Sequence, residues 1–198
     1  RRHIQQYGDL RSLPDKVAIQ LNDTHPAVAV AEMMRLLIDI HAFEFDEAWE
    51  MTQKIFSYTN HTLLPEALES WPVPLFERLL PRHMQLVYAI NAKILRYAWK
   101  EKNYNDDQIR SISLIQEDGE RRVRMGNLAF FGSHSINGVS ALHTDLMKKT
   151  VFHDLHTLFP DRINNKTNGI TPRRWLMQCN PDLASLLRET IGDGFMDD

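Results

Sequence analysis

A polar segment near the C-terminal end of the chain constrains its fold more than any other feature. It reads Asn-Asn-Lys-Thr-Asn-Gly-Ile-Thr-Pro-Arg-Arg-Trp over residues 164–175. Thr171 is a favoured N-cap residue, and Pro172 suits the first helical position, where a missing N–H costs nothing. A helix that begins here has free N–H groups and a partial positive charge, to which Arg173 and Arg174 add. The segment therefore predicts a place that holds a polar or anionic group.

Two more polar segments lie upstream. Residues 21–26 read Leu-Asn-Asp-Thr-His-Pro, and residues 57–69 read Ser-Tyr-Thr-Asn-His-Thr-Leu-Leu-Pro-Glu-Ala-Leu-Glu. The first segment ends a short apolar run, residues 16–21, which suits a buried strand, and a helical pattern follows it. Asp23 and His25 are therefore expected where a strand ends and a helix begins, the edge at which open α/β sheets bind ligands.

Helical periodicity dominates the rest of the chain. The longest expected helix begins at Pro81 and ends near Lys102. Asp118-Gly119 separates residues 113–116 from residues 121–125 and predicts a β-hairpin, whereas residues 126–137 fit either a helix or a strand. The pattern indicates a helix-rich α/β fold with a small β-hairpin. Other helices are expected over residues 26–41 with Thr24 as cap, from the cap Asp46 onwards, and over residues 65–70, 140–149, 151–159, 171–179 and 181–191.

Composition excludes several classes of protein. The chain has 198 residues, a net charge of −3 and 43% hydrophobic residues, which fits one or two globular domains. The near-neutral charge argues against nucleic-acid binding, and no apolar run is long enough to span a bilayer. The one cysteine, Cys179, excludes an intramolecular disulfide and fits a reducing compartment such as the cytoplasm. Its apolar helical surroundings predict a buried core thiol.

The side chains of the polar segments fit more than one role. His61 lies in a loop that either binds a ligand or only satisfies backbone groups. Glu66 and Glu69 are three residues apart on an expected helix, so they are either acid–base carboxylates or a solvated face. Asp23 and His25 form either a charge-assisted pair or helix caps. The nine histidines show no metal-ligand spacing, and no bound metal is expected.

Taken together, the three polar segments resemble those of the α-glucan phosphorylases, the family of glycogen, starch and maltodextrin phosphorylases. The segments occur in the family's order with plausible spacing, and the similarity runs from about Pro14 to Gly192. Further landmarks that look like the family's are Trp71-Pro72-Val73, Leu80-Pro81-Arg82-His83, Gly132-Ser133-His134 and Asn137-Gly138-Val139.

The resemblance implies a fold and an activity. The family is similar to the two-lobe glycosyltransferase-B-type enzymes, in which two α/β lobes face each other across a cleft. Its members cleave α-1,4-glucans from the non-reducing end with inorganic phosphate and release glucose 1-phosphate. Pyridoxal phosphate is their cofactor, and its phosphate relays protons. Residues 1–164 are then expected to form the C-terminal part of the first, glucan-binding lobe, and residues 165–198 the start of the second, cofactor-binding lobe.

The resemblance also implies roles for single residues. His61 resembles the catalytic-site histidine, whose side chain bonds the glucose 6-hydroxyl and whose carbonyl lies near the anomeric carbon. Asn168 resembles the asparagine that bonds glucose hydroxyls from the opposite wall, and Trp175 resembles a tryptophan near the cofactor phosphate. The residues expected to line the sugar subsites are Asp23, His25, Thr62, Glu66 and Glu69.

A second site is implied on the longest helix. Its polar and aromatic stretch, off the apolar stripe, fits either sugar binding or a wet helix face. By resemblance it matches the surface glycogen-storage site of the family. The residues expected there are Gln85, Tyr88, Asn91, Glu117 and Arg121.

Other parts of the family's machinery are expected outside this sequence. The Schiff-base lysine and the groups that bind phosphate belong beyond residue 198, and the glycine loop over the glucosyl site belongs before residue 1. The family includes cytoplasmic, allosteric enzymes, and the parent is expected to be a homodimer. The chain alone is expected to be inactive and to self-associate.

Two rival functions stay open from the sequence. One is a glucan-binding module without catalysis, which would hold its ligand at Tyr88. The other is a metal-dependent hydrolase that uses Asp23, His25, His61 and Glu66.

Overall fold

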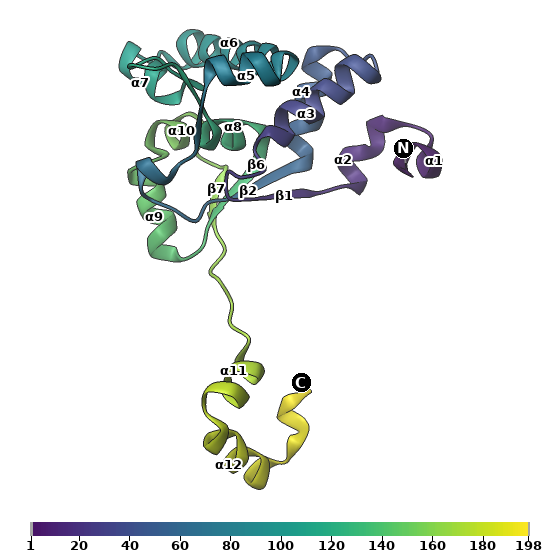
Figure 1. Cartoon of the computed structure of the whole chain (residues 1–198), viewed down its shortest axis with the longest axis vertical. Coiled ribbons are helices and arrows are strands. Elements are labelled where there is room, and N and C mark those ends of the chain that lie inside the picture. The colour runs from purple at the N-terminus through teal and green to yellow at the C-terminus, as the bar shows by residue number, and fades with distance from the viewer. Residues whose placement is uncertain (1, 198) are drawn as a thin grey trace. The chain divides into compact units, whose positions relative to one another are not determined.

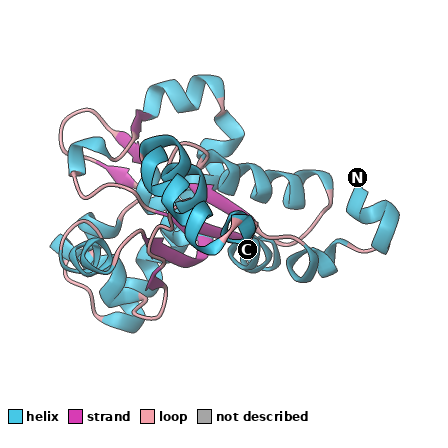
Figure 2. Ribbon diagram, turned by 90° about the horizontal axis from the view of Figure 1, so that it is seen from below, coloured by secondary structure: helices cyan, strands magenta, loops and turns pink. Residues whose placement is uncertain are grey.

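The computed structural model describes residues 2–197, and helices make up most of them (Figure 2). The chain divides into two compact units at the junction between Lys166 and Thr167. The first unit contains a parallel sheet and a small antiparallel sheet, so the expectation of a helix-rich α/β fold is confirmed. Among residues 2–197, no helix is long and apolar enough to cross a membrane.

A four-stranded parallel sheet forms the centre of the first unit (Figure 1). Its strands follow one another in the order β1 (Ile19–Asn22), β2 (Phe56–Thr59), β6 (Ser133–Gly138) and β7 (Ile163–Asn165). Each strand pairs in parallel with its neighbour in this order. The register between β2 and β6 shifts between Phe56 and Ser57. Since all four strands are parallel, their carboxyl ends lie at one edge of the sheet.

One face of the sheet is apolar. Leu21, Tyr58, Ile136 and Ile163 stand side by side in register across the four strands, and each is at most 5% exposed. Such a row requires helices to cover it, because the hydrophobic effect stabilises each fully buried side chain of this size by about 1.5–3 kcal/mol. Parallel strands supply those helices, since every crossover between them needs a long connection.

The opposite face of the sheet is polar. The neighbouring row, one residue further along the strands, is Asn22, Thr59, Asn137 and Asn164. These side chains bond to one another and to nearby groups: Thr59 Oγ1 donates to Asn137 Oδ1 at 2.8 Å and accepts from Gln20 Nε2 at 2.9 Å. The period of two along each strand therefore delivers amides and hydroxyls toward the carboxyl edge.

The crossover helices differ in how completely they are buried. All eight residues of α8 (Met125–Gly132) are buried, because α3, α4, β2 and β6 pack around it. From the sequence, residues 126–137 fitted either a helix or a strand. In the structure they form both, because α8 ends at Gly132 and β6 begins at Ser133. The remaining crossovers are α3 (Val28–Arg35) continued by a π-helical turn (Leu36–Ile40), α4 (Phe45–Ile55), α9 (Ala141–Lys149) and α10 (His153–Leu158).

A second layer is built on α6 (Pro81–Lys102), whose bounds agree with the prediction. This helix packs on α3 and lies farther from the sheet than α8 (Figure 1). The expected hairpin is confirmed as β4 (Ile115–Gln116) and β5 (Arg122–Arg124). A third strand, β3 (Ser70–Pro72), was not expected, because two prolines hid a pairing with β5 that is distant in sequence. The connecting helices are α5 (Val73–Leu79) and α7 (Asp106–Ile112), and the N-terminal elements are α1 (Arg2–Tyr7), a 3₁₀ turn (Leu10–Ser12) and α2 (Leu13–Lys16).

Two predicted helix caps are wrong. The helix after β1 begins at Val28, and Thr24 instead donates its hydroxyl to Glu69. Glu44 occupies the N-cap position of α4, and Asp46 lies in its first turn, where its carboxylate pairs with Lys93 at 2.8 Å. In both places a partner distant in sequence takes the side chain that a local cap would have used.

The second unit consists of α11 (Pro172–Cys179), α12 (Pro181–Ile191) and a 3₁₀ turn (Asp193–Met196). Ala184 is the only buried residue in its described part. Cys179 is exposed, so the prediction of a core thiol is wrong, because two short helices do not enclose a core. Thr171 holds the N-cap position of α11, but its side chain makes no capping hydrogen bond.

Gly132 tests how tightly α8 packs. A Cβ at this position would meet Val30 Cγ1 at 2.5 Å, whereas a Cβ at Gly169 would meet nothing within 4 Å. We expect Gly132→Ala to lower the free energy of unfolding by about 1–3 kcal/mol, the usual cost of overpacking a core. Urea unfolding followed by circular dichroism measures the change. Gly169→Ala is the control, and equal stabilities of the two variants would contradict the close approach of α8 and α3.

Candidate functional site

Two of the predicted polar segments meet at the carboxyl edge of the parallel sheet. Residues 21–26 continue β1 and residues 57–69 continue β2, and these strands are parallel neighbours. Backbone bonds extend the pairing past the strands: Asp23 N–H donates to Thr59 O at 2.9 Å, and Asn60 N–H donates to Asn137 O at 3.0 Å. These bonds attach the start of each loop to the neighbouring strand: Asp23 to β2 and Asn60 to β6.

Glu69 holds one side of this edge together. Its Oε1 accepts from His25 Nδ1 at 2.9 Å, and its Oε2 accepts from the Thr24 hydroxyl at 2.7 Å. The hydrogen bond and charge of Glu69 raise the pKa of His25, while the Thr24 hydroxyl, opposed in part by desolvation, lowers the pKa of Glu69. The charged form of each group is therefore favoured, and the His25 ring is kept in one orientation at an exposed position.

His61 is oriented by an asparagine on the neighbouring strand. Its Nε2 lies 2.8 Å from Asn22 Oδ1, the last residue of β1. An amide oxygen only accepts, so Nε2 carries the proton, and Nδ1 of the neutral ring is left as an acceptor. The exposed imidazole thus has a defined tautomer at the sheet edge.

A buried amide holds the His61 loop. Asn60 is fully buried; its Nδ2 donates to the Tyr58 hydroxyl at 3.0 Å. Its Oδ1 accepts from Thr62 N–H at 3.2 Å and from His143 Nε2 at 3.0 Å. Losing this amide would leave the buried Tyr58 hydroxyl without this donor, at about 1–3 kcal/mol, and would release two half-buried groups. The sequence assigned no site role to Asn22, Asn60 or His143. Strand register brings Asn22 to His61, and the β6–α9 connection brings His143 to Asn60, so neither contact can be predicted from local spacing.

Some predicted site residues act differently from the expectation. Glu66 lies in a single 3₁₀ turn (Pro65–Ala67), and Glu69 lies outside it, so the two do not share a helix face. Asp23 Oδ1 accepts from the neighbouring Thr24 N–H at 2.7 Å, and Asp23 adopts a left-handed φ of 60°. Its carboxylate therefore shapes the turn, and the hydrogen-bonded partner of His25 is Glu69. Thr62 Oγ1 accepts from Leu64 N–H at 3.1 Å.

A second cluster surrounds Tyr88 on α6. The Tyr88 hydroxyl donates to Glu77 Oε1 at 3.1 Å and accepts from Arg121 Nη2 at 3.3 Å, with the Arg121 guanidinium 5.9 Å from the ring centre. Gln85 accepts from Arg82 at 3.1 Å. The Asn91 amide instead accepts from Leu114 N–H at 2.8 Å and so fixes the segment before β4. Glu117, at the end of the hairpin strand, is exposed.

The remaining predicted residues, Asn168 and Trp175, belong to the second unit. Trp175 is 66% exposed, and within that unit Arg173 donates its Nε to Phe195 O at 3.1 Å. Within residues 2–197 no three His, Cys, Asp or Glu side chains are grouped in a way that could hold a metal ion.

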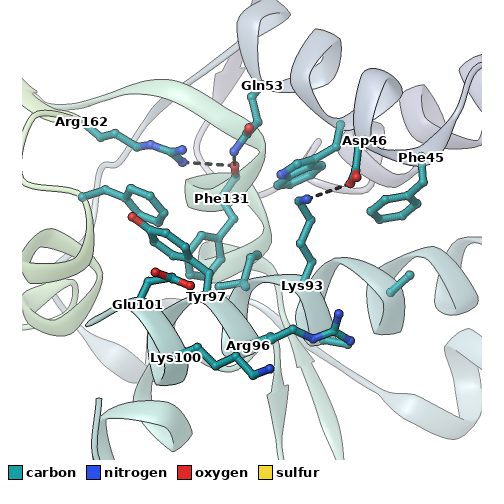
Figure 3. Close-up of a pocket in the computed structure, with 15 residues that line it drawn as sticks. Phe45, Asp46, Gln53, Lys93, Arg96, Tyr97, Lys100, Glu101, Phe131 and Arg162 are labelled. Atoms are coloured by element: carbon teal, nitrogen blue, oxygen red, sulfur yellow. Dashed lines mark hydrogen bonds and ion pairs between the residues drawn. The ribbon is translucent and has the colours of Figure 1, made fainter. Parts of the chain in front are cut away.

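A cavity of about 750 Å³ lies elsewhere in the first unit, between α4, α6, α8 and the segment that precedes β7 (Figure 3). None of the predicted site residues lines it. The carboxyl edge is therefore the better candidate for the predicted chemistry. Its imidazoles, carboxylate, amides and hydroxyls suit a ligand rich in hydroxyl groups, whereas aromatic and basic side chains line much of the cavity.

Comparison with known proteins finds similarity to phosphorylases, both in a family model and in individual relatives. The family model described as "Carbohydrate phosphorylase" matches residues 1–198. The glycogen phosphorylase of Chlamydia pneumoniae is 50% identical over 198 residues, which is 100% of this chain and 24% of that protein. The liver form of Homo sapiens is 53% identical and the brain form of Rattus norvegicus 51%, each over 94% of this chain and 22% of that protein. The chain thus spans about a quarter of the length of these curated relatives.

The His25–Glu69 pair predicts a measurable titration. A pKa raised by Glu69 means that the pair is fully present below the ordinary histidine value of about 6.5, down to the lowered pKa of Glu69, and is lost as the pH rises through the higher folded value of His25. We expect Glu69→Gln to lower the His25 pKa, measured by NMR titration of its ring protons. Glu66→Gln, at a neighbouring exposed carboxylate, should leave it unchanged, and equal effects of the two variants would contradict the pairing.

Proposed function

The chain belongs to the carbohydrate phosphorylase family, and we propose that the protein carrying it cleaves α-1,4-glucans with inorganic phosphate. The reaction removes one glucosyl residue from the non-reducing end and releases glucose 1-phosphate. One observation carries the proposal: the segments with Asp23, His25, His61 and Glu69 converge at the carboxyl edge of one sheet. Ligands of open α/β sheets bind at that edge.

His61 is proposed as a residue that binds the reacting sugar. The bond of its Nε2 to Asn22 leaves Nδ1 as an acceptor, which suits a hydrogen bond from the glucose 6-hydroxyl. Its backbone carbonyl is proposed to lie near the anomeric carbon, where positive charge develops in the transition state. A carbonyl dipole held in place beforehand stabilises that charge without reorganisation. The buried Asn60 amide supplies the rigidity that this role needs.

Glu69 is proposed to position His25 at the sugar subsites. Both carboxylate oxygens are engaged, one by His25 and one by Thr24, so Glu69 orients the ring. A fixed imidazole can bond a sugar hydroxyl with little loss of side-chain entropy. Asp23, Thr62 and Glu66 are proposed as further lining of the same subsites.

Asn168 and Trp175 are proposed to act from the second lobe, with residues 1–164 belonging to the first. Asn168 would bond glucose hydroxyls, and Trp175 would lie near the phosphate of pyridoxal phosphate, the cofactor implied by the family. The residues of this chain do not by themselves form a site for that cofactor, because Trp175 is mostly exposed and the second unit buries only Ala184 in its described part. The chemistry of the cofactor therefore depends on residues other than these.

The Tyr88 cluster is proposed as a second glucan-binding surface. An aromatic ring fixed by Glu77 and Arg121 offers a flat face to a sugar and polar groups at its rim. Gln85 and Glu117 would supply further hydrogen bonds, and the Asn91 amide would support the site through its bond to the segment before β4. Binding here would keep the enzyme on its polymeric substrate.

We also propose a cytoplasmic, homodimeric, allosterically regulated enzyme, as in the family that the sequence resembles. The second unit exposes Ile170, Leu186 and Ile191 at 86%, 57% and 62%. Such apolar surface predicts self-association of the 198-residue chain on its own.

The proposed reaction is tested through His61. In a longer protein that contains this sequence, His61→Ala should lower kcat/KM for glucose 1-phosphate release from maltoheptaose by about tenfold to a hundredfold, the equivalent of one hydrogen bond to the substrate. His41→Ala, at an exposed histidine in the turn after α3, should have no effect. The 198-residue chain should release no glucose 1-phosphate, because catalysis needs glucan, phosphate and cofactor held together.

Either of two results would count against this proposal. Equal rates of the His61→Ala and His41→Ala enzymes would remove His61 from the site. Phosphorolysis by the purified 198-residue chain would show that no second lobe is needed.

The second glucan surface is tested by electrophoresis in gels that contain glycogen. We expect Tyr88→Ala to raise the Kd of the chain for glycogen about tenfold, equivalent to about 1.4 kcal/mol, which would appear as weaker retardation in the gel. Trp99→Ala, an exposed aromatic residue on the same helix, is the control. Retention that survives Tyr88→Ala would place glucan binding elsewhere.

A further inference from the structure

The cavity between α4, α6 and α8 has features of a ligand site separate from the carboxyl edge. Its volume of about 750 Å³ falls in the range of small-molecule sites. Residues of α4, α6, α8 and the segment before β7 line it, and its remaining side is open to solvent (Figure 3). Since α4 and α8 also pack on the central sheet, these walls are parts of the core.

One wall of the cavity is aromatic. The Tyr97 and Phe159 rings stack with centroids 5.9 Å apart and planes 8° from parallel. The Phe131 ring meets Phe159 edge-on at 6.1 Å. Aromatic rings held in this way offer a flat apolar surface at low entropic cost, which suits the ring of a ligand.

A cation without a carboxylate partner lies on the same wall. Arg162 stacks 4.1 Å over the Phe159 ring, and its Nη1 donates to the backbone oxygens of Phe130, Phe131 and Ser133. Burial lowers the pKa of Arg162 to about 10. No carboxylate of residues 2–197 lies within 4 Å of it. A guanidinium has five N–H donors, and removing it from water is costly unless an anion compensates the charge.

Two further cations at the cavity have no acidic partner in the described chain. Arg96 and Lys100 are exposed, one helical turn apart on α6, and neither forms an ion pair. Lys93 differs, because its ammonium is paired with Asp46 at 2.8 Å (Figure 3). The cations that line the cavity therefore exceed its two acids, Asp46 and Glu101.

We propose that this cavity binds a small organic anion in which a phosphate or carboxylate is attached to a flat ring. The ring would lie against Tyr97 and the aromatic wall, and the anion would accept hydrogen bonds from Arg96 and Lys100, with Arg162 adding positive charge from the opposite side of the cavity (Figure 3). Guanidinium groups bind phosphate and carboxylate in a bidentate manner and are preferred in such sites. The site is distinct from both glucan surfaces proposed above.

A packed protein segment is a poorer occupant of the same space. An apolar segment would bury Arg96, Lys100 and Glu101 without partners, at a desolvation cost that the contacts would have to offset. A small anion instead pairs the cations and leaves their exposed sides in water.

The test uses isothermal titration calorimetry of the 198-residue chain at low salt with 1-naphthyl phosphate. We expect this probe to bind at least about tenfold more tightly than 1-naphthol, which lacks the anion, and than inorganic phosphate, which lacks the ring. 1-Naphthoate tests the carboxylate form and should also bind more tightly than 1-naphthol. The double variant R96Q/K100Q should raise the Kd for 1-naphthyl phosphate about tenfold or more.

The control is the double variant R110Q/K149Q, which removes two exposed cations outside the cavity and should leave the Kd unchanged. Equal affinity for 1-naphthol and 1-naphthyl phosphate would overturn the proposal, as would an unchanged Kd in R96Q/K100Q. Binding by this chain that disappears in a longer chain containing it would assign the cavity to another segment and would also overturn the proposal.

Discussion

The apolar row Leu21–Tyr58–Ile136–Ile163 is the constraint on which the first unit depends. It crosses all four parallel strands on one face, and each of its side chains is buried. Parallel strands cannot be joined by hairpins, so each connection had to become a helical crossover, and the crossovers cover that row. The helix α8, buried along its whole length, follows from the same requirement, because it packs directly on β2 and β6.

The polar face of the sheet has the opposite consequence. A parallel sheet is usually apolar on both faces, but here Asn22, Thr59, Asn137 and Asn164 form a row of amides and a hydroxyl. Most of these polar atoms are hydrogen-bonded: the Thr59 hydroxyl donates to Asn137, and the amides of Asn137 and Asn164 donate to backbone oxygens, whereas the buried Asn164 Oδ1 has no partner among residues 2–197. The row lies at the carboxyl edge, where Asn22 bonds His61. Because side chains alternate between the two faces of each strand, the same strands supply apolar residues to the core and polar residues to the site.

The first unit therefore offers two different chemical environments. At the carboxyl edge, imidazoles and amides are fixed by bonds such as that of Asn60 to His143, which suits a neutral ligand rich in hydroxyls. At the cavity on α6, Arg162 stacks on an aromatic wall and has no carboxylate partner among residues 2–197, which suits an anion with an apolar ring. Since the two places share no residues, binding at one can be altered without changing the contacts of the other.

The sequence by itself determined the longest helix, the hairpin and the polar segments, but it did not predict the strands β2, β3 and β7. Pro81–Lys102 follows from an uninterrupted 3.6-residue period after a proline, and the β4–β5 hairpin from Asp118-Gly119. The placement of Asp23 and His25 between a strand and a helix also followed from the pattern. The strand before His61, β2, did not, and the roles given to all three residues rest on the resemblance. Only the tertiary structure decided which groups those residues meet. Glu69 bonds Thr24 and His25 from 44 residues away or more, and Asn60 bonds His143 across 83 residues. Strand register creates such contacts, and neither spacing nor composition encodes register directly. The exposure of Cys179 was missed for a related reason: periodicity reports an apolar face, but the structure decides whether anything covers it.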